Sequence, residues 1–191
     1  MTTLRKHVSD SLRAIGYRRL EKSVHLLSLD ADFSLWVNTG VVGLATDIAP
    51  YIGLRSHSVE EARGALMDLP DCPTTVTVGA NVGYILDGHY RAWSAGSDPA
   101  EILSTITAGL EKLRPFASLS ALPGAFHFRG VAGSPGTPYV AVVVALLLQD
   151  RPTVITRLED ARRVYCSRPD EVCEQFRGFE ARVHARLGTV A

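Results

Sequence analysis

The chain has 191 residues, 46% of them hydrophobic, and its 20 basic and 20 acidic side chains leave a formal net charge of zero at pH 7. This length and composition are typical of a packed globular protein that needs no metal or disulfide for stability, which excludes an intrinsically disordered chain. The basic residues are spread along the chain and matched by acids, so neither nucleic acid nor an anionic membrane is expected as a partner.

The cysteines and the N-terminus bear on the cellular compartment. Cys72, Cys166 and Cys173 are an odd number of thiols, and the N-terminus is polar, which together predict reduced cysteines in the cytoplasm. Cys166 and Cys173 fall on successive predicted helices and are interpreted as small packing residues, with a regulatory disulfide as the alternative. No cofactor and no metal are expected.

The first elements in chain order are a helix and a β region. A helix is expected over about residues 4–15, ended by Gly16. Its apolar residues recur at helical spacing: Leu4, Val8, Leu12 and Ile15. Alternating polarity over 33–38 predicts a strand with two unlike faces, paired with 24–29 across a short turn. A third strand is expected at about 48–54.

The next segment reads as a helix followed by more strands. Ser58 and Glu61 have the spacing of a capping box and predict the start of a helix. A strand is expected at 74–78. Asp87-Gly88 suits a type I′ turn and predicts a hairpin of 82–86 with 89–94.

That hairpin would place six side chains on one face of the sheet. The opposed pairs would be Leu86 with His89, Tyr84 with Arg91, and Val82 with Trp93.

The second half of the chain is mainly helical. Asp98 and Pro99 predict a helix start, with an inward stripe that reaches Leu113. Residues 114–137 are less regular, and the Gly-rich segment 130–136 is interpreted as a flexible loop.

Three helices are expected after this loop. The apolar run over about 137–149 predicts a helix, with a buried strand as the alternative. Further helices are expected over 150–165 and from near Pro169. The short links between the three predict antiparallel neighbours.

These elements predict a single α+β domain over residues 1–191. An antiparallel sheet of about five or six strands, with helices mainly on one face, would occupy 1–136. A C-terminal helical layer would occupy 137–191.

We find no catalytic or nucleotide-binding motif of any specificity. Residues 79–83 lack the spacing of a dinucleotide loop, and no Lys-Ser or Lys-Thr follows 130–136. His57 lies near Glu60 and Glu61, but helix capping explains those glutamates. No catalytic residue is therefore assigned.

The candidate binding residues are Trp36, Tyr90, Arg91 and Trp93. These are the residue types that most often anchor protein interfaces. Two interpretations remain open: the four side chains cover the sheet, or they form a binding surface. On the second, Trp93→Ala should weaken partner binding while the fold is retained.

The order of elements resembles a bacterial domain-of-unknown-function family of small cytoplasmic α+β proteins. The resemblance rests on Gly16-Tyr17-Arg18-Arg19, Trp36, Tyr90-Arg91-Ala92-Trp93 and Arg114-Pro115-Phe116, and covers most of residues 4–187 in outline. Some members of that family are associated with polymorphic-toxin immunity genes. The resemblance implies no catalytic set.

The leading hypothesis is thus a non-enzymatic protein-binding protein, such as an immunity-type inhibitor that occludes a partner with its sheet face or its Gly-rich loop. The alternative is a small-molecule-binding protein or enzyme that uses His57 or His89 in a pocket beside the sheet. A third hypothesis is a homodimer formed through an edge strand or the last helix.

Overall fold

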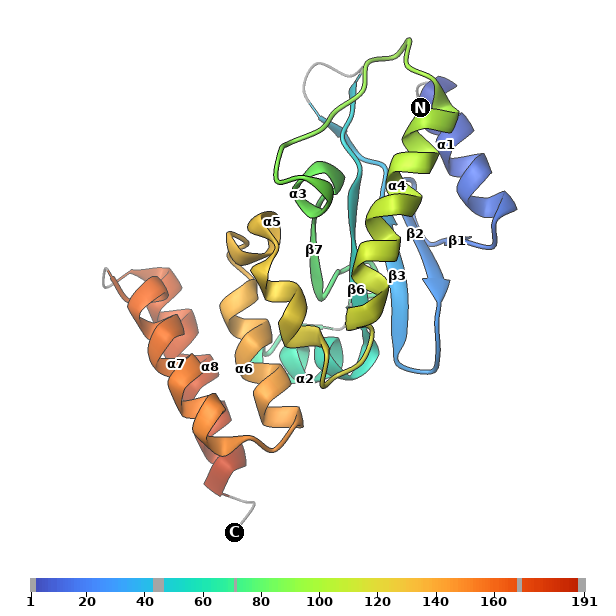
Figure 1. Cartoon of the computed structure of the whole chain (residues 1–191). Helices are drawn as coiled ribbons and strands as arrows, with labels where there is room; N and C mark the ends of the chain where they lie inside the picture. The colour runs from blue at the N-terminus through green and yellow to red at the C-terminus, as the bar shows by residue number, and fades with distance from the viewer. Residues whose placement is uncertain (1–2, 43–46, 71, 168–169, 189–191) are drawn as a thin grey trace. The chain divides into compact units, whose positions relative to one another are not determined.

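The computed structural model describes residues 3–42, 47–70, 72–167 and 170–188 and has an α+β fold (Figure 1). The chain divides into two compact units. The first contains Met1–Ser56 and Pro73–Ser134, and the second contains His57–Cys72 and Pro135–Ala191. The sequence did not predict that residues 57–72 belong to the same compact unit as the C-terminal helices.

The first unit is built on an open antiparallel sheet of five strands in the order β1-β2-β3-β6-β7. These strands are β1 (Arg18–Arg19), β2 (Val24–Ser28), β3 (Phe33–Asn38), β6 (Tyr51–Ser56) and β7 (Val78–Asn81). The expected pairing of 24–29 with 33–38 is confirmed.

The strand expected at 48–54 is divided in two. β4 (Val41–Val42) and β5 (Asp47–Ile48) form a separate antiparallel pair, and β6 begins only at Tyr51. Pro50 lies between β5 and β6, and it has no N–H to contribute to a ladder.

Two helices of the first unit lie side by side and cover one face of this sheet: α1 (Thr3–Ala14) and α4 (Pro99–Leu113) (Figure 1). α4 begins as the sequence predicts, because the Asp98 side chain accepts a hydrogen bond from the N–H of Ala100. Its inward stripe is fully buried: Ile102, Ile106, Leu110 and Leu113. Hydrophobic burial along this stripe holds α4 on the sheet.

The hairpin expected around Asp87-Gly88 is absent, and a short helix, α3 (Val82–Leu86), takes its place. The Asn81 side chain caps this helix by accepting from the N–H of Gly83. At its other end, the N–H groups of Asp87 and Gly88 both donate to the carbonyl of Gly83, and Gly88 has a φ of 81°. An Asp-Gly pair suits a helix end, where the glycine alone takes a positive φ, as well as a hairpin turn, and here it ends a helix.

The segment expected to be a strand at 74–78 and the expected Gly-rich loop also differ from the structure. The strand is β7 and begins only at Val78. Between α4 and the second unit, the chain forms η1 (Arg114–Phe116), η2 (Leu122–His127) and α5 (Arg129–Ala132). The first residues of segment 130–136 are therefore helical, not part of a flexible loop.

The described part of the second unit contains four helices: α2 (His57–Met67), α6 (Thr137–Leu147), α7 (Arg151–Tyr165) and α8 (Glu171–Gly188). The structure confirms a helix, not a strand, for the apolar run that α6 contains. α2 begins one residue before the predicted cap Ser58, so Ser58 lies inside the first helical turn. Pro169, the expected start of the last helix, lies outside the described residues.

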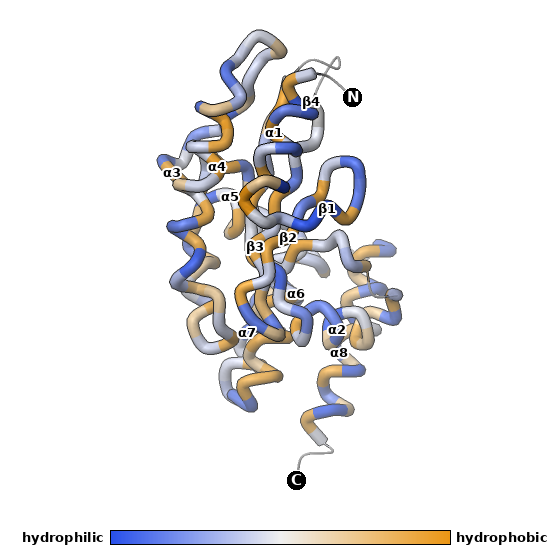
Figure 2. The backbone as a smooth tube through the Cα atoms, turned by 90° about the vertical axis from the view of Figure 1, so that its right-hand side faces the viewer, coloured by the Kyte–Doolittle hydropathy of each residue, from blue (hydrophilic) through white to orange (hydrophobic). Residues whose placement is uncertain are grey.

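Aromatic side chains fill the core of this second unit. Tyr139 stacks on Tyr165 with ring centroids 4.6 Å apart, and Phe176 and Phe179 of α8 complete the cluster. Figure 2 shows hydrophilic and hydrophobic residues alternating toward the C-terminal end of α8. Val172, expected on the apolar face, is exposed, and the neighbouring Cys173 is buried instead.

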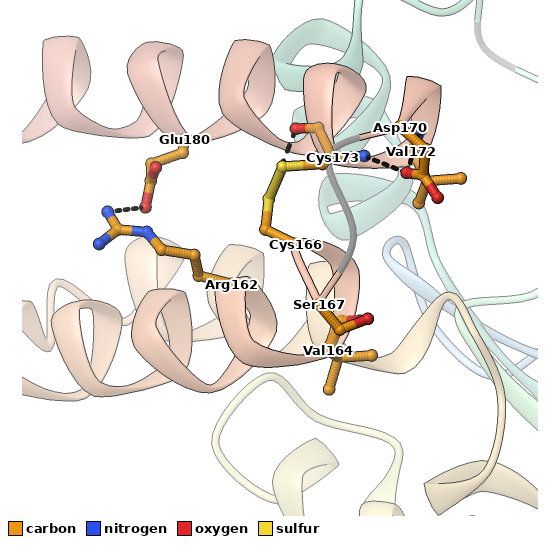
Figure 3. Close-up of a disulfide and its surroundings, with 8 residues drawn as sticks. All are labelled: Arg162, Val164, Cys166, Ser167, Asp170, Val172, Cys173 and Glu180. Carbon is orange, nitrogen blue, oxygen red and sulfur yellow. Dashed lines mark hydrogen bonds and ion pairs between the residues drawn. A yellow bond between two sulfur atoms is a disulfide. The ribbon is translucent and has the colours of Figure 1, made fainter.

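The interpretation of Cys166 and Cys173 as reduced packing residues is wrong. Their sulfur atoms form a disulfide between the end of α7 and the start of α8 (Figure 3). Arg162 and Glu180, further along the same two helices, form an ion pair with an N–O distance of 2.6 Å. Because α7 and α8 pack antiparallel, the two members of each pair lie opposite one another.

Candidate functional site

The structure separates the four candidate binding residues into a buried pair and an accessible pair. Trp36 and Trp93 are both buried, the latter with 8% of its surface exposed. Tyr90 is 48% exposed, and the Arg91 side chain is 41% exposed. Only Tyr90 and Arg91 are placed where another molecule could contact them.

Each tryptophan has a structural role in the first unit. Trp36 of β3 donates from its indole Nε1 to the carbonyl of Thr74 over 3.0 Å. Trp93 forms an isolated β-bridge with Ile48, and its Nε1 donates to Glu101 Oε1 over 3.1 Å. A buried indole with its N–H satisfied is typical of a core residue.

Tyr90 and Arg91 lie against α3. The Tyr90 ring is tilted on Tyr84 of α3, with centroids 6.1 Å apart. The Arg91 guanidinium forms an ion pair with Asp87 at the end of the same helix. Since there is no hairpin, the expected opposition of Tyr84 and Arg91 is replaced by these contacts. We call the four residues Tyr84, Asp87, Tyr90 and Arg91 the Tyr90 surface.

Asn81 fixes the backbone of this surface. Its Oδ1 accepts from the N–H of Arg91 over 2.9 Å and from the N–H of Gly83 over 3.0 Å. Its Nδ2 donates to the Arg91 carbonyl over 2.8 Å. Asn81 is fully buried. The amide therefore joins α3 to the extended segment that carries Tyr90 and Arg91.

Gly83 allows this close approach. A Cβ atom at position 83 would overlap the His89 carbonyl oxygen and lie 2.6 Å from Arg91 Cγ. The absence of a side chain at Gly83 lets residues 89–91 lie directly on α3. This close approach, the Asn81 hydrogen bonds and the β-bridge of Trp93 with Ile48 together attach the segment to the rest of the first unit.

Two cationic side chains contact the carboxyl end of α3. Lys112 Nζ donates to the Leu86 carbonyl over 2.7 Å, and Arg129 donates to the Gly88 carbonyl over 3.4 Å. Cations at this end of a helix are favourable because its terminal carbonyls carry partial negative charge. A hydrogen bond from Arg91, and a second from the N–H of His89, lower the pKa of Asp87, so its carboxylate stays ionised at neutral pH.

The Gly-rich segment supports the Tyr90 surface at its start. A Cβ at Gly130 would lie 2.6 Å from Ala80 Cβ and 2.9 Å from Tyr84 Cδ2. Gly130 is therefore a packing residue that lets α5 approach β7 and α3.

The histidines proposed for a catalytic pocket lie apart from the described hollows. His57 begins α2 and His89 is exposed on the first unit. An apolar hollow of about 390 Å³ lies in the second unit, lined by Leu146, Leu147, Gln149, Arg151, Val154, Arg186 and Leu187. Among its described lining residues there is no histidine, cysteine or carboxylate to act as a nucleophile or base.

A buried serine–histidine pair was not predicted from the sequence. Ser9 Oγ lies 2.8 Å from His25 Nε2, and His25 Nδ1 lies 3.2 Å from the Ser23 carbonyl. Both side chains are fully buried, so substrate could not reach the hydroxyl. Within the described ranges, no three His, Cys, Asp or Glu residues are grouped so as to hold a metal ion.

The described part of the chain contains no helix with both the length and the apolar character needed to cross a membrane. Comparison of the chain with known protein families, with curated proteins and with solved structures finds no match in any of the three.

Proposed function

We propose that this chain is a non-enzymatic protein-binding protein whose contact region is the Tyr90 surface. The observation that carries the proposal is an exposed Tyr–Arg pair on a backbone fixed by the buried Asn81. Tyrosine and arginine supply much of the binding energy in protein interfaces. A segment that is already ordered before binding loses little conformational entropy on association.

An inhibitor that acts by occlusion fits this kind of surface. Such a protein needs a rigid surface that covers a partner's working region and no reactive groups of its own. The toxin-immunity role implied by the family resemblance is one case of this mechanism, with the partner a toxin. We therefore propose, more specifically, that the chain is an immunity protein that inhibits a toxin.

The test is affinity capture from a lysate of the organism that encodes the chain. Three baits are compared: the unaltered chain, Tyr90→Ala/Arg91→Ala, and the control Tyr51→Ala. Tyr51 is a matched control because this residue of β6 is 42% exposed and lies outside the Tyr90 surface. We expect one stoichiometric protein with the unaltered chain and the control, and its loss with the double variant.

Equal recovery by all three baits would remove the Tyr90 surface from the proposal. Recovery of no protein by any bait would contradict the protein-binding function itself. The immunity form is tested by expressing the captured partner in a host cell. Growth should stop, and co-expression of the unaltered chain, but not of the double variant, should restore it.

A further inference from the structure

β1 follows the end of α1 and forms one edge of the first unit's sheet (Figure 1). A basic hollow lies at this edge. Its volume is about 700 Å³, and its lining consists of Arg13, Tyr17, Arg18, Arg19, Leu20, Glu21 and Lys22. Four cations and one carboxylate therefore meet in a chain whose formal net charge is zero. Such a local excess of one charge attracts ligands of the opposite charge.

Most of this positive charge is not neutralised by neighbouring acids. Arg18 and Lys22 have no ion-pair partner among the residues that the structure describes. Arg13 forms an ion pair with Asp10, with an N–O distance of 3.7 Å. The two side chains are 60% and 52% exposed, and the attraction between such exposed charges is weak in water. Arg19 Nε donates to the backbone carbonyl of Glu21, not to its carboxylate.

The outer edge of β1 also offers backbone hydrogen-bonding groups. In an antiparallel ladder, bonded and non-bonded residue pairs alternate. The N–H of Leu20 donates to the carbonyl of Val24, which makes these two a bonded pair. Arg19 lies opposite His25 and is the next pair in the register, so it is the non-bonded pair. The N–H and C=O of Arg19 therefore point away from β2, toward the open edge.

We infer that this edge binds an extended, acidic segment of a partner protein, which adds to the sheet as a strand beside β1. The backbone of that segment would bond to the N–H and C=O of Arg19, and its carboxylates would meet the surrounding cations. Strand addition of this kind takes affinity from main-chain bonds and specificity from side chains. Arginine suits the second task because its guanidinium binds a carboxylate through two parallel bonds.

Two other occupants fit less well. A second copy of this chain would bring the same cations to the edge, and repulsion between charged edge residues prevents self-pairing of strands. A single-stranded nucleic acid would need exposed rings for its bases. Tyr17 is the one aromatic residue among the described lining residues, and it is buried. A phosphate backbone could use the cations but not the peptide edge.

The inference takes from the proposed function only that the partner is a protein. Its test needs no identified partner. The probe is a fluorescent peptide of about eight residues, a usual strand length, with alternating glutamate and threonine. In a second probe of the same sequence, the backbone amide nitrogens of the glutamate residues are methylated. In a third probe, the backbone amide nitrogens of the threonine residues are methylated instead. Binding is measured by fluorescence anisotropy at low salt.

We expect the unmodified peptide to bind and one of the two methylated peptides to bind about tenfold more weakly, because one set of amides faces the sheet and the other faces solvent. The variant Arg18→Ser/Lys22→Ser should weaken binding of the unmodified peptide by about tenfold. The control Arg157→Ser/Arg163→Ser removes the same charge from exposed positions on α7 and should change it by less than about twofold.

Equal binding of all three peptides would overturn strand addition, since charge alone would then explain the affinity. Equal loss in both double variants would overturn the assignment to this edge. Tighter binding of a short DNA duplex than of the peptide would favour a phosphate polymer instead. Each of these outcomes is independent of the capture experiment, which tests the Tyr90 surface.

Discussion

Ser9 of α1 and His25 of β2 are joined by a buried hydrogen bond of 2.8 Å between Ser9 Oγ and His25 Nε2. His25 Nδ1 is within reach of the Ser23 carbonyl, so a neutral ring that donates from Nδ1 and accepts at Nε2 satisfies both partners. The bond ties the first helix to the sheet, and it exists in this form only while the imidazole is neutral.

The first prediction is that the free energy of unfolding falls in mild acid. Burial lowers the pKa of His25, and Arg19, Arg5 and Arg13 lower it further by repelling the charged ring. Between the folded pKa and the unfolded value near 6.5, the unfolded chain binds more protons. The stability that neutral His25 contributes is therefore present above about pH 6.5 and is lost as pH falls through the folded pKa.

Urea unfolding at a series of pH values from neutral to mildly acidic measures this loss. The variant His25→Gln keeps hydrogen-bonding groups but does not titrate, so its stability should change less over the same range. If both proteins lose the same stability, His25 is not the source of the pH dependence.

The second prediction concerns Trp93. Because the ring is buried and its N–H bonds to Glu101, Trp93→Ala should lower the free energy of unfolding by about 3 kcal/mol or more. The burial of Trp93 thus replaces the expectation that this variant keeps its fold intact. Trp93→Phe retains most of the packing and should cost less. Tyr90→Ala, at an exposed position, is the comparison and should leave the midpoint of urea unfolding nearly unchanged.

Local sequence patterns predicted the elements whose ends are fixed by neighbouring residues. Asp98 accepts a hydrogen bond from the first turn of the helix it precedes, as its position indicates. Asp150 caps α7 in the same way, although the sequence pattern predicted only that helix and not its cap. Asp87-Gly88 was misinterpreted because its local preference suits two structures. The choice between them comes from Asn81, whose bonds to Arg91 span ten residues and leave no trace in a short sequence window.

The candidate site was predictable only in part, for the same reason. Residue type identified Tyr90 and Arg91, but Trp36 is buried, and its indole N–H bonds to the carbonyl of Thr74, 38 residues away in the sequence. The basic hollow was missed although its four cations lie within residues 13–22, because no more than two of them are consecutive and the chain as a whole is neutral. Gly16, with a φ of 99°, reverses the chain between α1 and β1 and brings Arg13 near Arg18 and Lys22.

The third prediction tests the close approach at Gly83. In an unconstrained helix, Gly→Ala is stabilising. At Gly83 the added Cβ would overlap the His89 carbonyl, so Gly83→Ala should lower the free energy of unfolding by about 2 kcal/mol. Gly96→Ala is the control, because a Cβ there meets no atom within 4 Å. Equal stability of the two variants would mean that residues 89–91 do not lie on α3 as described.

The fourth prediction concerns the disulfide between Cys166 and Cys173, which are 7 residues apart. Closing a loop of this size restricts the unfolded chain and should stabilise the folded state by about 2 kcal/mol. Cys72, whose thiol is exposed, is the remaining cysteine. Thiol titration of the unfolded, unreduced protein should therefore detect one thiol of the three cysteines. After reduction it should detect all of them.

Reduction should lower the midpoint of urea unfolding in the unaltered chain. The variant Cys166→Ala/Cys173→Ala should show the lower midpoint with or without reductant, because it has no bond to break. Full thiol reactivity in the unreduced protein would contradict the disulfide. A disulfide that forms without changing the midpoint would mean that the unfolded chain already keeps Cys166 and Cys173 close together, so that closing the loop between them removes little of its entropy.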